Sequence, residues 1–223
     1  MTKVLFFQAA GKVTLGLVLV TALLFLPAGT LRYPNGWLFM ALLFVPMLAA
    51  GFVLMAKSPY LLQKRLKAKE PERTQRRVVG ASALVFALGF VTSGLCFRFR
   101  RFLVPGWVVW AACTVFLLGY ALYGIVMAHN RWLARTVEIQ PGQNLVDSGP
   151  YALVRHPMYT AVLLMFLSTP LILGTWLPLP LFCAFPAILV RRIWNEEQVL
   201  TAGLDGYADY KTRVKYRLIP LVW

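Results

Sequence analysis

Long stretches without a charged residue dominate the hydrophobic pattern of this chain. Four of them are long enough to cross a bilayer as helices, which takes roughly 20 residues. They comprise residues 13–31, 37–56, 78–97 and 104–128. Pro27 and Pro46 fall inside the first two runs, where neighbouring helices can satisfy the carbonyl groups that a proline leaves free. The pattern therefore predicts four transmembrane helices.

A fifth uncharged run, residues 157–190, is too long for one span. As a single helix it would measure about 50 Å at ~1.5 Å per residue, against a hydrocarbon core of about 30 Å. The run is interrupted at Pro170, Gly174, Pro178, Pro180 and Pro186. We predict a helical hairpin with two short arms that turns near residues 174–180. Short, interrupted membrane segments often carry binding sites.

The composition supports an integral membrane protein. The 223 residues are 59% hydrophobic and 14% charged, and the mean hydropathy is +0.66. A soluble domain of this size could not bury so much apolar surface. We expect one all-α membrane domain, residues 1–223, with about four transmembrane helices, a C-terminal helical hairpin and a cytosolic C-terminal helix. Residues 1–128 form the four-span scaffold of this domain.

The charges predict how the chain is oriented. The net charge is +15, but the basic residues lie between apolar runs, which favours anionic lipid and membrane topology over nucleic acid as the explanation. If both termini are cytoplasmic, 19 of the 23 Lys and Arg residues lie inside, as the positive-inside rule requires. The basic stretch 97–101, "FRFRR", is the exception, because it is predicted outside. No secretory signal is evident, since the first apolar run is too long and lacks a cleavage site.

Two further features have ordinary structural interpretations. The segment 57–77 mixes leucines with basic residues, which predicts an interfacial helix on anionic lipid. Cys96, Cys113 and Cys183 lie in or at the ends of apolar segments. Their spacing fits neither a disulfide nor a metal site, so we expect them to serve packing and predict no metal.

Polar residues concentrate in two blocks that flank the predicted hairpin, residues 129–159 and 191–220. A hairpin returns the chain to the side it came from, so the two blocks should meet at one membrane face. Pro157 suits the first turn of the first arm, which places Arg155 and His156 at a helix N-terminus that favours anions. The alternative is an ordinary juxtamembrane arginine and an interfacial histidine.

The second block has the same two interpretations. Arg192 and Glu196 are four residues apart, on one helix face, and could form a solvated ion pair of little energetic value. Tyr207 and Tyr210 fit an interfacial aromatic belt equally well. The residues alone leave these alternatives open.

The motifs in these blocks resemble the isoprenylcysteine carboxyl methyltransferase family of membrane enzymes. The resemblance rests on "GQNLVDSGPYALVRHPMYTA" (142–161), "NEEQVL" (195–200), "GYADYKTRV" (206–214) and "RLIP" (217–220), in this order around an apolar hairpin. It covers roughly residues 129–223. Phospholipid N-methyltransferases, a thiol methyltransferase and, more remotely, NADPH-dependent sterol reductases share this C-terminal pattern.

The resemblance implies a site for S-adenosylmethionine (SAM), with S-adenosylhomocysteine as product, in the portion 129–223. Its cofactor-binding residues would be Gln143, Asn144, Leu145, Val146, Tyr151, His156, Pro157, Met158, Tyr159 and Glu196. Glu197, Tyr207 and Tyr210 are possible additional members. Arg192 would hold the carboxylate of the acceptor, and Arg155 is the second residue to which we assign a catalytic role.

The chemistry of methyl transfer suits these residue types. Tyrosine faces stabilise a sulfonium cation, Glu196 suits an ammonium, and His156 or helix N-terminal amides suit a carboxylate. A carboxylate acceptor is already ionised and needs an arginine to orient it, such as Arg192. The sequence thus favours a membrane carboxyl methyltransferase that takes a lipophilic or prenylated acceptor from the bilayer. Its active site would be cytoplasmic, at the inner membrane of a bacterium or the endoplasmic reticulum of a eukaryote.

Several alternatives stay open at this point. A phospholipid amine or small thiol as acceptor must lose a proton, so it would need a base, for which His156 or Glu197 are candidates. An NADPH-dependent membrane reductase would bind a different cofactor. A transporter or non-catalytic membrane protein would usually carry charges within its spans, and the four predicted spans have none.

Overall fold

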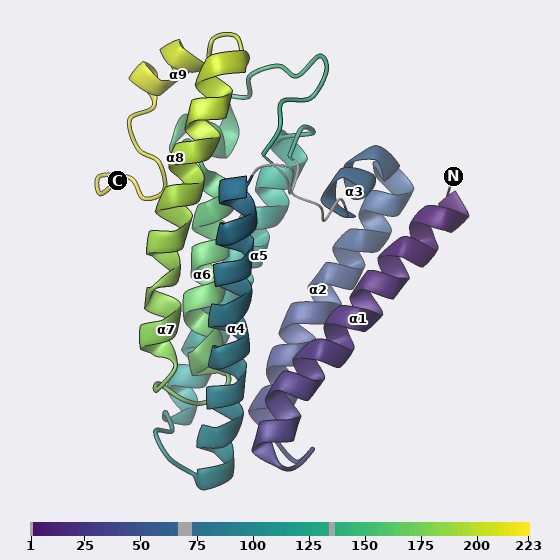
Figure 1. Cartoon of the computed structure of the whole chain (residues 1–223), viewed down its shortest axis with the longest axis vertical. Helices are drawn as coiled ribbons and strands as arrows, with labels where there is room; N and C mark the ends of the chain where they lie inside the picture. Colours follow the sequence, from purple (N-terminus) through teal and green to yellow (C-terminus); the bar gives the residue numbers. More distant parts are fainter. Residues whose placement is uncertain (1, 67–72, 134–136) are drawn as a thin grey trace.

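The computed structural model describes residues 2–66, 73–133 and 137–223, and all its regular elements are helical. They are α1 (Thr2–Ala28), α2 (Pro34–Lys57), α3 (Pro59–Leu66), α4 (Arg73–Phe99), α5 (Gly106–His129), the 3₁₀ helix η1 (Gly149–Ala152), α6 (Pro157–Ile172), α7 (Leu179–Cys183), α8 (Phe185–Gly203) and α9 (Tyr207–Arg213). The long helices α4, α5, α6 and α8 run up and down along one axis, and α1 and α2 are inclined to it (Figure 1).

The four predicted spans are confirmed as helices long and apolar enough to cross a membrane, namely α1, α2, α4 and α5. The chain is therefore a multi-pass, all-α membrane protein, as predicted. The start of the first helix was predicted too late, because α1 begins at Thr2 and not at residue 13. Lys3 and Lys12 are compatible with the longer helix, since a lysine near the end of a span can extend its charged group toward water.

The predicted hairpin is also confirmed. Its arms are α6 and the α7–α8 pair, and they are joined by residues 173–178. The second arm is longer than predicted, because α8 continues beyond the apolar run to Gly203. The sequence from Arg191 to Ala202 contains neither proline nor glycine, so the helix can continue through it. Pro186 lies in the first turn of α8, where proline is tolerated. This extension carries the polar residues of the second block away from the apolar layer.

Glycines allow two pairs of helices to approach closely. A Cβ atom on Gly119 of α5 would lie 2.7 Å from Met165 Cγ and 2.9 Å from the Ala161 carbonyl oxygen, both on α6. A Cβ atom on Gly94 of α4 would lie 2.5 Å from the Leu24 carbonyl oxygen of α1. Inside a bilayer the hydrophobic effect does not drive helices together, because the lipid tails are as apolar as the side chains. Close backbone packing of this kind is therefore a main source of helix association. Gly119 thus fixes α6, whose N-terminus forms part of the site described below.

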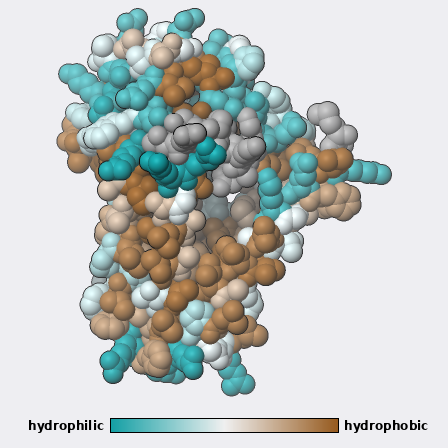
Figure 2. All heavy atoms as spheres, in the orientation of Figure 1, coloured by the Kyte–Doolittle hydropathy of each residue, from teal (hydrophilic) through white to brown (hydrophobic). Residues whose placement is uncertain are grey.

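The molecule has two polar ends and an apolar middle. Figure 2 shows hydrophobic side chains gathered in a belt, with hydrophilic ones above and below it. Both termini, α3, α9 and the connection between α5 and α6 lie toward the upper end in Figure 1, and the turns after α1, α4 and α6 lie at the lower end. The two polar blocks of the sequence thus meet at one end, as expected.

Part of the basic segment 57–77 is helical, as predicted. Within it, α3 covers Pro59–Leu66, while residues 67–72 lie outside the described part of the chain. Leu61 and Leu62 of α3 are buried, and the ammonium group of Lys12 on α1 donates a hydrogen bond to the Leu66 carbonyl group. This helix therefore packs on the protein as well as presenting basic side chains.

Candidate active site

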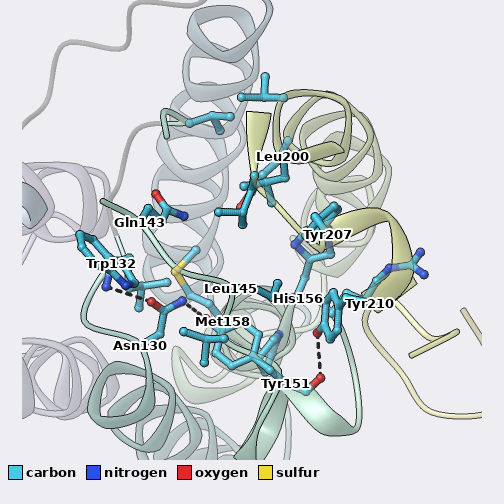
Figure 3. Close-up of a pocket in the computed structure, with 18 of the residues that line it drawn as sticks. Asn130, Trp132, Gln143, Leu145, Tyr151, His156, Met158, Leu200, Tyr207 and Tyr210 are labelled. Atoms are coloured by element: carbon cyan, nitrogen blue, oxygen red, sulfur yellow. Dashed lines mark hydrogen bonds between the residues drawn. The ribbon is translucent and has the colours of Figure 1, made fainter. Parts of the chain in front are cut away.

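A pocket opens at the upper end of the molecule, between the α5–α6 connection, the start of α6, the end of α8, and α9. The empty space between its walls is about 840 Å³ when its open mouth to solvent is included. It is lined by Asn130, Trp132, Leu133, Val137, Glu138, Gln143, Asn144, Leu145, Val146, Tyr151, Arg155, His156, Pro157, Met158, Tyr159, Glu196, Val199, Leu200, Leu204, Tyr207 and Tyr210. Figure 3 shows side chains from both polar blocks pointing into it.

Thirteen of the residues singled out from the sequence line this pocket together, although the hairpin separates them along the chain. They are Gln143, Asn144, Leu145, Val146, Tyr151, Arg155, His156, Pro157, Met158, Tyr159, Glu196, Tyr207 and Tyr210. The structure thus brings Tyr151, His156, Tyr159 and Glu196 into one pocket, while their roles in binding a cofactor stay predictions. Arg192 and Glu197 are not among the lining residues, and both are buried behind the pocket.

The segment before α6 is paired with the C-terminal part of the chain. The backbone N–H groups of Arg155 and His156 donate hydrogen bonds of 2.9 Å to the carbonyl groups of Tyr216 and Arg217, respectively. Because α6 begins at Pro157, these two N–H groups were candidates for binding an anion at its N-terminus. They are used instead to hold residues 216–217 against the start of the helix.

Glu197 is the centre of a buried charge cluster. Arg155 Nε donates to Glu197 Oε1 over 2.7 Å, and His156 Nε2 lies 3.3 Å from the same oxygen. Arg217 Nε donates to Glu197 Oε2 over 3.1 Å. A second nitrogen of Arg155 donates to the carbonyl groups of Val214 and Lys211. Arg155 is thus a positioning residue that ties the C-terminal segment to α8.

The cluster controls the ionisation of Glu197. Burial by itself would raise the pKa of this carboxyl group. The hydrogen bond to His156 and the charges of His156, Arg155 and Arg217 outweigh it and lower the pKa from the ordinary 4.5 to about 2. The Glu197 side chain is therefore a carboxylate at neutral pH, and a very weak base.

Arg192 and Glu196 are connected through a tyrosine. Arg192 Nε donates to the Tyr159 hydroxyl group over 2.7 Å, and that hydroxyl group donates to Glu196 Oε2 over 2.5 Å. Arg192 is only 9% exposed, so the alternative of a solvated ion pair is wrong for this residue. Glu196 and Tyr159 line the pocket, whereas Arg192 is buried and does not line it.

Three tyrosines form one wall of the pocket (Figure 3). The Tyr210 hydroxyl group donates to the Tyr151 carbonyl oxygen over 2.7 Å, and Asn130 Nδ2 donates to the Tyr151 hydroxyl group over 2.8 Å. Burial raises the pKa of Tyr151 to about 12. Burial, together with the charges of Glu197 and Glu196, also raises the pKa of Tyr207. All three side chains therefore stay protonated and can donate.

Tyr207 differs from the other two tyrosines. It is 3% exposed, and within the described residues its hydroxyl oxygen has no hydrogen-bond partner. Leaving a buried hydroxyl group without a partner costs about 1–3 kcal/mol. A polar ligand in the pocket that Tyr207 lines would remove this cost.

Sequence reasoning missed part of the pocket. The missed lining residues are Asn130, Trp132, Leu133, Val137, Glu138, Val199, Leu200 and Leu204. Helical spacing could have found two of them, because Val199 and Leu200 follow Glu196 by three and four positions and so share its face. The partner of Glu197 in the C-terminal segment, Arg217, was also missed, since it is brought in by backbone pairing that leaves no local pattern.

The scaffold portion also reaches the pocket through α3. The Tyr60 hydroxyl group donates to Gln140 Oε1 over 3.3 Å, and Arg65 lies 5.2 Å from the Tyr123 ring and 3.8 Å from Met158 Sδ. Met158 lines the pocket. The first half of the chain therefore supports the site as well as spanning the membrane.

Comparison with known proteins covers most of the residues that line the pocket. Residues 110–202 match the model of the isoprenylcysteine carboxyl methyltransferase (ICMT) family. The protein-S-isoprenylcysteine O-methyltransferase of Schizosaccharomyces pombe is 28% identical over 143 residues, which cover 57% of each protein. The cobalt-zinc-cadmium resistance protein CzcN of Cupriavidus metallidurans is 30% identical over 129 residues, 56% of each protein.

A relative with a different named activity is also similar to part of this chain. The delta(14)-sterol reductase TM7SF2 of Mus musculus is 37% identical over 91 residues, which cover 40% of this chain and 22% of the reductase. The chain thus matches between about a fifth and little more than half of the length of these curated relatives.

A solved structure shares the fold. The eukaryotic intramembrane Ras methyltransferase ICMT superposes with a TM-score of 0.60 at 21% identity, covering 96% of this chain and 75% of that protein. The match of the family model confirms the resemblance inferred from the motifs around the hairpin. Residues 110–202, which hold the start of α6 and nearly all of α8, carry the sequence pattern of the isoprenylcysteine carboxyl methyltransferase family.

Proposed function

We propose that this chain is a SAM-dependent membrane methyltransferase that methylates the carboxylate of a lipidated or amphiphilic acceptor, such as a C-terminal isoprenylcysteine. The observation that carries this proposal is the pocket itself. It unites the residues of the family motifs from both sides of the hairpin, at the end of an apolar helix pair. A polar cofactor could enter from the aqueous side, and an acceptor from the bilayer.

The lining of the pocket fits SAM. Glu196 offers a carboxylate for the ammonium group of the cofactor, and the tyrosine wall offers π-faces for its sulfonium cation. The buried hydroxyl group of Tyr207 is a donor and acceptor that such a ligand could satisfy. The segment Gln143–Val146 and the apolar side chains of Val199 and Leu200 supply the remaining walls.

When bound, SAM supplies an activated methyl group, and the protein has to hold the nucleophile in line with it at about 3–3.5 Å. We assign the orientation of the acceptor to Arg192. The hydrogen bonds from Arg192 to Tyr159 and from Tyr159 to Glu196 couple the acceptor side of the site to the cofactor side. Tyr159 thereby keeps the two groups at a fixed separation.

The charge cluster around Glu197 argues against this residue, one of the two candidate bases, as the base that an amine or thiol acceptor would need. An amine or thiol must be deprotonated by a base whose pKa lies near the working pH. Glu197 has its pKa lowered to about 2 and lies outside the pocket lining, so it does not suit this task. A carboxylate acceptor needs no base, which leaves Glu197 its positioning role.

The function is tested by transfer of labelled methyl groups from SAM to three acceptors: a prenylcysteine analogue, phosphatidylethanolamine and a small thiol. We expect transfer to the prenylcysteine carboxylate. Transfer to the thiol or the amine alone would disprove the proposed acceptor and keep the methyltransferase class. Stabilisation of the purified protein by NADPH and not by S-adenosylhomocysteine would instead favour a reductase.

We predict that Glu196→Ala weakens S-adenosylhomocysteine binding about ten- to hundred-fold. A charge-assisted hydrogen bond to a ligand ammonium is worth roughly 1.5–3 kcal/mol, which corresponds to that loss in affinity. Calorimetric titration of folded wild type and variant measures it. Gln198→Ala is the matched control, because Gln198 is an exposed neighbour on α8 outside the pocket and should bind as wild type does. Equal affinity of Glu196→Ala and wild type would remove Glu196 from the cofactor site.

We also predict that both termini and the pocket face the cytoplasm, because 19 of the 23 Lys and Arg residues then lie inside. Both termini lie toward the same end of the helices as α9 and the α5–α6 connection, which supports an even number of crossings (Figure 1). Residues of α9 and of this connection line the pocket. Reporter fusions at each end, active on only one side of the membrane, measure this orientation. A C-terminus on the opposite side from the N-terminus would contradict it. Anionic lipid at this face is the expected partner of the basic α3 region.

A further inference from the structure

The end of the molecule opposite the pocket is purely basic. The turns at this end present Arg32, Arg98, Arg100 and Arg101, all of them exposed. All eight Asp and Glu residues fall between residues 70–72 or from residue 138 onward, so the segments 29–37, 97–108 and 173–180 contain none. Arg98, Arg100 and Arg101 belong to the stretch "FRFRR" (97–101), which the positive-inside rule leaves unexplained. The proposed methyl transfer does not use it.

The loop that carries Arg100 and Arg101 has a backbone that is strained and firmly held. Arg100 and Phe102 have φ angles of 51° and 59°, in the left-handed region that disfavours side chains with a Cβ atom. The loop is fixed to the hairpin turn, because the Phe102 carbonyl oxygen accepts hydrogen bonds from Trp176 N (3.1 Å) and Thr175 Oγ1 (3.0 Å). Val104 N adds a bond of 3.0 Å to the Gly174 carbonyl group. Such strain persists only where the surroundings impose it, and it often marks a functional site.

The surroundings of the arginines place them at the level of lipid head groups. Trp107, Trp176 and Trp37 are 73%, 47% and 49% exposed at this same end, and the Phe102 and Trp176 rings pack edge to face. Exposed tryptophans at the end of a span are typical of the membrane–water interface. Figure 2 shows hydrophilic side chains at this lower end directly below the apolar belt. All four cations are guanidinium groups, which grip a phosphate with two parallel hydrogen bonds.

We infer that Arg98, Arg100 and Arg101, with Arg32 beside them, form a binding site for the phosphate head group of an anionic phospholipid in the leaflet opposite the pocket. The fit rests on complementary charge, on the planar donors, and on the interfacial aromatic side chains that would pack against the acyl chains. The fixed loop holds the backbone of Arg100 and Arg101 in one conformation, next to Arg98 at the end of α4. The site is independent of the methyl acceptor.

The test is the thermal stability of the detergent-purified, delipidated protein on titration with phosphatidylglycerol. For wild type we expect a rise of Tm that saturates with lipid concentration. The variant R98Q/R100Q/R101Q should bind the lipid with an apparent affinity about a hundred-fold weaker, because each arginine near the membrane surface contributes about 1 kcal/mol. K57Q/R76Q/R77Q removes three exposed cations near the other end and should keep most of the shift. Phosphatidylcholine and inorganic phosphate should give no comparable shift.

A second variant separates lipid binding from folding. Arg100→Gly removes one guanidinium group and also relieves the left-handed strain at residue 100, so its Tm without lipid should equal or exceed that of wild type. Its response to phosphatidylglycerol should still be weaker. An undiminished lipid response of Arg100→Gly or of the triple variant, or an equal response to phosphatidylcholine or to free phosphate, would overturn the inference.

Discussion

Glu197→Gln is expected to destabilise the protein by about 3–5 kcal/mol, the typical cost of removing one partner from a buried ion pair. The change leaves the Arg155 guanidinium group, 6% exposed, without the carboxylate that accepts its 2.7 Å hydrogen bond. Arg217 loses its partner as well, and the residues that hold 216–217 against α6 loosen with it. Thermal unfolding in detergent, followed by circular dichroism, measures the loss.

The chain offers a matched control for this variant. Arg213 and Asp147 form an ion pair of similar length, 2.9 Å, with side chains 59% and 41% exposed. Asp147→Asn should cost at most about 1 kcal/mol, because solvent already screens an exposed pair. The double variant Arg155→Met/Glu197→Leu should recover part of the lost stability, since it removes both buried charges. Equal Tm values for Glu197→Gln and Asp147→Asn would show that the buried cluster contributes no special stability.

The same cluster makes a stability contribution that depends on pH. The pKa of Glu197 is about 2 in the folded protein, against an ordinary value of 4.5. A lowered pKa in the folded state means that the contribution is complete above pH 4.5 and is lost as the pH falls toward 2. A difference of this size corresponds to a contribution on the order of 3 kcal/mol. Glu197→Gln should therefore show a smaller decrease in Tm than wild type between pH 5 and the lowest pH at which both remain soluble.

The spans could be predicted because each depends on a local property of the sequence. A bilayer fixes the length of an uncharged run that forms a helix, and proline and glycine mark where the 157–190 run turns. The residues at which the polar ends of the helices begin and end were harder to predict. Lys3 and Lys12 lie within α1, and α8 continues to Gly203, because charge alone does not end a helix when neither proline nor glycine follows.

The site was predictable as a set of residues but less so in its arrangement. The hairpin implied that the two polar blocks meet, and the pocket unites them. Adjacent residues on a helix point about 100° apart, so Glu196 faces the pocket while Glu197 faces Arg155 and Arg217. The sequence could not say which glutamate faces which way, since that depends on how α8 is rotated. The pairing of residues 155–156 with 216–217 is likewise a long-range contact without a local pattern.

Arg192→Lys is expected to lower methyl transfer to a prenylcysteine carboxylate about a hundred-fold while S-adenosylhomocysteine affinity falls much less. Lysine keeps the charge but cannot reproduce the planar two-pronged grip on a carboxylate. A displacement of the acceptor by about 1 Å is enough for a rate loss of this order. Affinity should be nearly kept because Arg192 does not line the pocket and is joined to Glu196 through the Tyr159 hydroxyl group.

Tyr159→Phe tests whether the hydrogen bonds from Arg192 to Tyr159 and from Tyr159 to Glu196 contribute to both turnover and cofactor binding. It removes the hydroxyl group that joins Arg192 to Glu196 but leaves both charges in place. We expect it to lower turnover and also to weaken cofactor binding, because Glu196 loses the donor that orients its carboxylate. Single-turnover methyl transfer and calorimetry on the same two variants separate the effects. Wild-type turnover in Arg192→Lys, or transfer only to an amine or thiol regardless of residue 192, would exclude Arg192 as the residue that orients the carboxylate.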